Sequence, residues 1–162
     1  MTGWMRFWLR RGVRTMSDIR LEREFPVTQK RLFEVLTTQS HIVQWWGHDG
    51  WIMIEEQLDF SRTGPWFADM RSEEGNRFKL SGQVTRVSPH DIIGFTWGWH
   101  DEEDQRGPES HVTFTIAETA KGARLVVDHR ELVSDDIAAQ HERGWGGPLS
   151  RLERLLSIET KN

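Results

Sequence analysis

The chain has 162 residues and contains no cysteine and no tyrosine. Without cysteine there is no disulfide, no thiol nucleophile and no cysteine-ligated metal, and such a composition fits a reducing compartment, so we expect a cytoplasmic protein. A basic surplus is also lacking, because the formal net charge is −4. This argues against nucleic acid as a partner. No window approaches the roughly 20 apolar residues of a membrane span.

Motifs for several common chemistries are missing as well. The seven histidines show no HxxxH or HExxH spacing, which favours scattered surface or capping histidines over a metal site. Ser40, Ser61, Ser81 and Ser110 all lack the glycine pattern of a nucleophile elbow. The acidic run 101–109 is interpreted as a solvated loop rather than a metal site. We therefore expect no metal and no cofactor.

Large aromatic side chains are what the sequence has in abundance. Nine tryptophans and eight phenylalanines stand in a chain in which 36% of the residues are hydrophobic. Tryptophan is bulky and rigid and carries one donor, which suits it to cores and to the walls of ligand pockets. The next point is therefore which face of each predicted element these rings occupy.

Hydrophobic periodicity predicts a strand, two short helices and then six strands. Thr28 is a good N-cap for the first helix, and Gly-Pro, Gly-Asn and Lys-Gly turn signals separate the later strands. Their short spacing predicts an antiparallel, meandering sheet. In chain order the expected elements are a strand at 19–25, helices at 28–37 and 40–46, and strands at 51–58, 64–73, 76–88, 90–100, 109–118 and 122–131.

A long amphipathic helix is predicted from Ser134 to Ile158, with apolar residues recurring at steps of three and four. Ser134 can cap it, and Asp135 and Asp136 place negative charge at the positive end of its dipole. The helix needs a surface for its apolar stripe, and the predicted sheet offers one. Pro148 follows several glycines, so we expect a kink or a broken turn at 144–148.

Residues 1–15 read as an upstream extension, poorly ordered or accessory, before a single domain at 16–162. An alternative is a short interfacial anchor, since this stretch mixes aromatic residues with arginines.

The element order and three sequence stretches resemble a known family. The stretches are 28–36 followed by Trp45-Trp46, 82–89 leading into 92–97, and Gly144-Trp145 followed by Leu149, Leu152 and Leu156. They are similar to the domain related to the activator of the Hsp90 ATPase, in the START/Bet v 1-like (SRPBCC) superfamily. The resemblance covers about 19–156 and implies an α+β helix-grip fold, a curved antiparallel sheet of about seven strands around a long C-terminal helix.

The same resemblance indicates function only broadly, because the family includes lipid and polyketide binders, cyclases and stress proteins. Thr63-Gly64 and Arg62 depart from the Gly-Gly pair and upstream arginine that the family often has before its third strand. No role is carried over from that turn, and the co-chaperone role of larger relatives is not carried over either.

Strand alternation turns many aromatic residues towards the predicted helix, where they either enclose a cavity or form a solid core. His129 shares a face with Leu125 and Val127, and Glu131 follows near the rim, so the pair could act as acid and base. The alternative is a core histidine satisfied by hydrogen bonds. The predicted ligand-binding residues are Trp46, Trp66, Met70, Phe78, Phe95, Trp97, Trp99, Phe114, His129 and Trp145.

Three functions follow from these interpretations. The first is the binding of a small apolar or aromatic molecule between the sheet and the C-terminal helix. The second is a cyclase- or hydrolase-like enzyme that uses His129 as acid or base. The third is a protein-interaction domain without a ligand, for which the sequence leaves a homodimer open.

Overall fold

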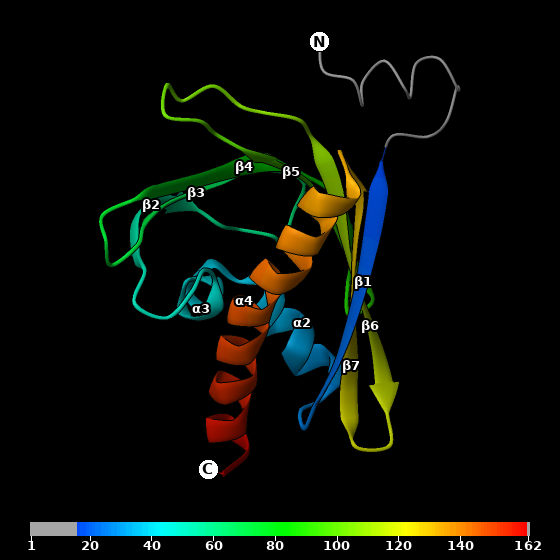
Figure 1. Ribbon diagram of the computed structural model, residues 1–162. Coiled ribbons are helices and arrows are strands. Elements are labelled where there is room, and N and C mark those ends of the chain that lie inside the picture. Colours follow the sequence, from blue (N-terminus) through cyan, green and yellow to red (C-terminus); the bar gives the residue numbers. More distant parts are fainter. Residues whose placement is uncertain (1–15, 162) are drawn as a thin grey trace.

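The computed structural model describes residues 16–161, so the predictions for residues 1–15 lie outside the described range. Within it the chain folds as one antiparallel sheet with two short helices and one long helix (Figure 1). This confirms the predicted α+β class and the predicted order of elements. Their bounds are β1 Ser17–Phe25, α2 Gln29–Thr37, α3 Gln39–Trp45, β2 Ile52–Gln57, β3 Gly64–Arg71, β4 Arg77–Ser88, β5 Ile92–Trp99, β6 Ser110–Thr119, β7 Gly122–Leu132 and α4 Asp135–Lys161.

The sheet has seven strands in the order β1-β7-β6-β5-β4-β3-β2. Figure 1 shows it bending around α4, with β1, β6 and β7 on one side of the helix and β2 to β5 on the other. Register shifts interrupt the ladders between Met53 and Glu55 in β2 and between Val84 and Arg86 in β4. Such bulges increase local twist and bend a strand, which is how a sheet acquires curvature.

Helix α4 begins as the sequence predicts and continues where it was expected to break. The Ser134 hydroxyl accepts a hydrogen bond from the amide of Ile137 (3.2 Å), so Ser134 is the N-cap. The helix then runs through Pro148 to Lys161 as one element, so of the two outcomes expected at 144–148, a kink or a broken turn, the broken turn was wrong. Proline removes one helical hydrogen bond and crowds the preceding turn, and the neighbouring glycines carry no side chains to add to that crowding.

Helices α2 and α3 support one end of α4. Thr28 caps α2 by accepting from the amide of Arg31 (3.1 Å), as predicted. The guanidinium of Arg151 in α4 donates to the carbonyls of Trp46 (2.7 Å) and Gln44 (3.0 Å), at the C-terminal end of α3. A cation there satisfies carbonyls that the helix leaves unpaired. The contact fixes Trp46 beside α4.

The core lies between the sheet and the three helices. Its largest fully buried side chains include Trp45, Trp66, Phe60, Phe95 and Phe114. Among the described residues, no helix is long and apolar enough to cross a membrane.

The glycines of α4 differ in what surrounds them, which predicts opposite effects for two alanine substitutions. A Cβ at Gly146 would meet no atom within 4 Å, whereas a Cβ at Gly147 would overlap the imidazole of His48. Gly146→Ala is expected to raise the free energy of unfolding by about 0.5–1 kcal/mol, because alanine loses less backbone entropy in a helix. Gly147→Ala should give no such gain, since His48 must move. Urea denaturation of both variants measures the difference, and equal effects would contradict this description of the helix.

Candidate functional site

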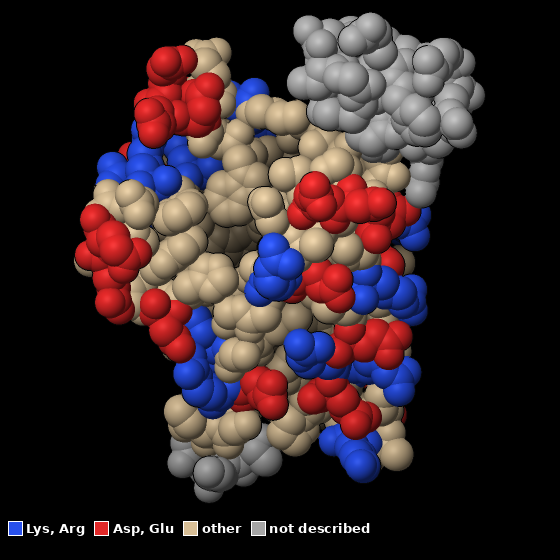
Figure 2. Space-filling view, viewed as in Figure 1, with Lys and Arg blue, Asp and Glu red and all other residues tan. Residues whose placement is uncertain are grey.

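A cavity of about 620 Å³ lies between the concave face of the sheet and α4. Figure 2 shows it as a hollow near the centre of one face, with walls mostly of uncharged residues and charged side chains around it. The cavity draws on β3, β4, β5, the segment after β7, α4 and the loop after α3. Its principal lining residues are Trp46, His48, Trp51, Met70, Phe78, Leu80, Trp97, Trp99, Ile137, His141, Gly144 and Trp145.

Trp97 is the centre of the aromatic wall. Its ring lies 5.9 Å from that of Trp46, 5.8 Å from Trp99 and 5.2 Å from Trp145, measured between ring centroids. Such tilted and edge-to-face pairs are the geometries that aromatic quadrupoles favour. The indole nitrogen of Trp97 is buried and finds no hydrogen-bond acceptor in the described part of the chain. The wall is therefore rigid and apolar, with one unsatisfied donor close to the cavity.

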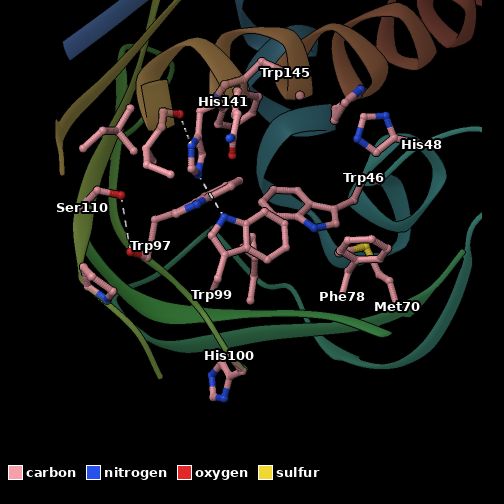
Figure 3. A pocket seen from close by; sticks show the side chains of 18 of the residues that line it. Trp46, His48, Met70, Phe78, Trp97, Trp99, His100, Ser110, His141 and Trp145 are labelled. Atoms are coloured by element: carbon pink, nitrogen blue, oxygen red, sulfur yellow. Dashed lines mark hydrogen bonds between the residues drawn. The ribbon is translucent and has the colours of Figure 1, made fainter. Parts of the chain in front are cut away.

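His141 of α4 joins this wall to the helix through two hydrogen bonds (Figure 3). Trp99 Nε1 donates to His141 Nε2 (2.9 Å), which requires an unprotonated Nε2. His141 Nδ1 then carries the proton and donates to the carbonyl of Ile137 (2.8 Å). Burial lowers the pKa of His141, although its bond to the Ile137 carbonyl opposes the shift. His141 is thus a neutral bridge between β5 and α4.

His129 makes a second bridge deeper in the protein. It is 0% exposed. Its Nδ1 accepts from Trp145 Nε1 (3.1 Å), and its Nε2 lies 2.7 Å from the hydroxyl of Ser110. Burial, and then the nearby His141 and His111, lower the pKa of His129 to about 3. Because Trp145 can only donate, Nδ1 is the unprotonated nitrogen and Nε2 donates to Ser110.

These bonds decide what His129 can do chemically. A general base needs a free lone pair facing the group that it deprotonates, and His129 instead presents N–H to Ser110. Glu131 lies at the cavity rim, but its carboxylate pairs with His111 (3.3 Å) and so does not orient His129. This arrangement favours the interpretation of His129 as a satisfied core histidine. Among residues 16–161, no group of three or more histidines or carboxylates is placed to hold a metal ion.

Comparison with known proteins identifies the family. The sequence profile of the activator of Hsp90 ATPase homolog 1-like proteins (AHSA1) matches residues 26–157. The chain belongs to this family. A search of curated proteins gives no match.

One solved structure agrees with this assignment, and two more distant ones share the fold alone. The crystal structure of the AHSA1 protein of Silicibacter pomeroyi is 48% identical, with a TM-score of 0.85 over 88% of this chain and 99% of that one. A protein of Chromobacterium violaceum (20% identical, TM-score 0.74, 86% and 96% covered) shares the fold. So does a protein of Rhizobium leguminosarum (18% identical, TM-score 0.77, 88% and 95% covered).

The structure of this AHSA1-like domain divides the ten predicted ligand-binding residues into two groups. Six line the cavity: Trp46, Met70, Phe78, Trp97, Trp99 and Trp145. The other four, Trp66, Phe95, Phe114 and His129, lie outside its lining, each at most 1% exposed in the core behind the wall. Alternation along a strand correctly places the eight of them that lie in strands on the inner face, and Trp46 and Trp145 come from the C-cap of α3 and from α4. It cannot say which part of that face is filled and which is open.

Some lining residues were not among the predicted site residues. His48 lies in the loop after α3, with its ring 4.6 Å from that of Trp51, and Trp51 in turn stacks on Phe78 (4.4 Å). Burial and the adjacent Arg151 lower the pKa of His48. No periodic pattern marks a loop histidine. His141, by contrast, falls on the apolar stripe of α4, and that position could have identified it.

Proposed function

We propose that this domain binds a small apolar or aromatic molecule in the cavity between the sheet and α4. The observation that carries the proposal is the cavity itself, about 620 Å³ with five tryptophans in its lining. That volume lies within the range of roughly 300–1,000 Å³ common for ligand pockets. Filling it would remove apolar surface from water at about 25 cal/mol per Å². A flat ring system fits walls made of flat rings.

The hydrogen bonds of His129 and His141 support binding of a ligand without its chemical conversion. His129 lies behind the wall and is neutral, and His141 has both ring nitrogens occupied. Neither offers a free proton acceptor to a ligand. These two histidines therefore serve to hold the aromatic rings, and the ligand would be recognised by shape and by the unsatisfied indole N–H of Trp97.

Two positions in α4 give a matched test. Gly144 lines the cavity, Gly146 does not, and a Cβ at either would meet no atom within 4 Å. Gly144→Leu should fill part of the cavity and weaken binding of an aromatic fluorescent probe, 1-anilinonaphthalene-8-sulfonate, at least about tenfold, or roughly 1.4 kcal/mol. Gly146→Leu should leave the affinity unchanged. Titration monitored by probe and tryptophan fluorescence measures both.

Native mass spectrometry of the purified protein would then identify any bound molecule, which Gly144→Leu should lose and Gly146→Leu should keep. Probe binding that survives His129→Ala would separate binding from an enzymatic role of that residue. Equal affinity of the two leucine variants would show that the probe sits elsewhere and would remove the support for this cavity.

A further inference from the structure

The outer face of the sheet carries a second polar cluster, of which only His100 also borders the inner cavity. Ser81 Oγ lies 2.7 Å from His100 Nε2, and His100 Nδ1 lies 2.9 Å from Asp104 Oδ1. A hydroxyl, an imidazole and a carboxylate joined in this order are the three parts of an activated serine nucleophile. The sequence gives no sign of it, because Ser81 has no nucleophile-elbow pattern and Asp104 lies in an acidic loop.

Strand pairing and a tight loop bring the three residues together. Ser81 in β4 pairs with Gly98 in β5, and His100 follows Gly98 on the same, outer face. Figure 3 shows His100 pointing away from the tryptophans of the cavity. The loop then turns back because the Asp101 carboxylate accepts from the amides of Glu103 and Gln105, both at 2.9 Å. This turn places Asp104 over His100.

The proton positions in this cluster are the reverse of those around His129. The Asp104 carboxylate can only accept, so His100 Nδ1 carries the proton and Nε2 is free to accept from the Ser81 hydroxyl. Lys79 donates a hydrogen bond to Asp104 (3.1 Å), and that bond, together with the bond from His100 and the charge of Arg77, lowers the pKa of Asp104. The carboxylate is therefore ionised at neutral pH. His100, unlike His129, is set to act as a base.

Arg106 completes the arrangement. Its Nε donates to Ser81 Oγ (3.0 Å), which leaves the serine proton free to point at His100. The guanidinium lies over Gly98, where a Cβ would come within 2.6 Å of Arg106 Cζ, so a residue larger than glycine there would displace it. A cation beside the attacking oxygen would stabilise negative charge that develops on a carbonyl oxygen.

Solvent and small molecules can reach this cluster. A groove of about 550 Å³ on the outer face is bordered by Ser81, His100 and Arg106, with Pro65 and Phe67 as its apolar part. The His100 side chain is 12% exposed and that of Asp104 is 49% exposed. The second serine–histidine pair, Ser110 and His129, is buried and has the opposite proton arrangement, so it provides an internal comparison within one protein.

We infer that Ser81, His100 and Asp104 form a hydrolytic site for small carboxylic esters, with Arg106 as the oxyanion donor. Ser81 Oγ bonds to the ester carbonyl carbon while its proton passes to His100 Nε2. That proton goes to the alcohol oxygen as the C–O bond breaks, which leaves an acyl group on Ser81. Water then gives a proton to His100 and bonds to the acyl carbon, and the proton returns to Ser81 as the acid leaves. Asp104 is a positioning residue.

A fluorophosphonate reagent tests the nucleophile directly, because phosphorus bonds to an activated serine as fluoride leaves. Peptide mass spectrometry of the labelled full-length protein should find the adduct on Ser81 and none on Ser110. His100→Gln should slow labelling about 100-fold, as expected for loss of a general base. Asp104→Asn should also slow it, and Asp104→Glu, which keeps the carboxylate, should restore part of the rate. Ser61→Ala, a surface serine with no histidine partner, is the matched control and should label normally.

Hydrolysis of 4-nitrophenyl acetate should follow the same order, with Ser81→Ala inactive and Ser61→Ala unaffected, while melting temperatures confirm that each variant folds. No adduct on Ser81 of the unchanged protein would overturn the inference whatever the variants do. An adduct that forms equally fast in His100→Gln would overturn it too. Neither result bears on the inner cavity, whose probe binding is measured separately.

Discussion

Acid is expected to destabilise this domain at a pH where its carboxylates are still ionised. The pKa of His129 is about 3 in the folded protein against an ordinary histidine value of 6.5. Between these values the unfolded chain binds a proton that the folded chain does not, so stability is present above pH 6.5 and is lost as the pH falls. At about 1.4 kcal/mol per pKa unit, His129 alone removes roughly 2 kcal/mol between pH 8 and 5 and about 4 kcal/mol by pH 3.

Two other histidines act in the same direction. Burial lowers the pKa of both His141 and His48, so each adds to the loss over the range just below the usual histidine value. Protonation of His129 would also deprive Trp145 of its acceptor, and protonation of His141 would deprive Trp99. Since Trp145 and His141 lie in α4 while His129 and Trp99 lie in the sheet, acid weakens the attachment of the helix to the cavity wall.

Urea denaturation at pH 8 and pH 5 measures the effect. His129→Gln should reduce the difference between the two pH values by about 2 kcal/mol. A pH dependence that is identical in His129→Gln and the unchanged protein would show that His129 is not held neutral by its surroundings.

The architecture could be predicted from the sequence because it depends on periodicity and local capping. Thr28 and Ser134 cap the helices where they were expected to, and all seven strands form in a meandering order apart from β1, which pairs with β7. Pro148 was misjudged, because the cost of a proline in a helix is weighed against tertiary packing that a local rule does not include. The buried Leu149 and Leu152 just after it anchor the helix to the core.

The site could be predicted only in part. Alternation tells which face of a strand a ring occupies, and it correctly placed Trp97 and Trp99 inside, while helical periodicity did the same for Trp145. It does not give depth, so Trp66 and Phe114 could not be separated from the residues that line the cavity. Which nitrogen of a histidine carries the proton is even harder to predict from the sequence, because it depends on the partner that each imidazole nitrogen meets. No sequence motif marks either His100 or His129. Their difference lies in the hydrogen-bond partners that the fold brings to each imidazole nitrogen.

The division of the interior into a filled half and an open half predicts unequal costs for two tryptophan substitutions. Trp66 is 1% exposed, donates to the carbonyl of Thr96 (3.0 Å) and packs against Phe60 and Phe95. Trp66→Ala should therefore lower the free energy of unfolding by about 3–5 kcal/mol, the cost of a large cavity in a packed core. Trp99 is only half-buried and already borders open space, so Trp99→Ala should cost about 1–2 kcal/mol, much of it from the lost bond to His141.

The two variants should differ in function in the opposite sense. Trp99 lines the cavity and Trp66 supports it from behind, so Trp99→Ala should change probe affinity by several-fold while Trp66→Ala, under conditions where it stays folded, should change it less. Urea denaturation and fluorescence titration of the same two proteins give both quantities. If Trp99→Ala were the more destabilising change, the concave face would be packed throughout, and the space beneath α4 on which ligand binding depends would be absent.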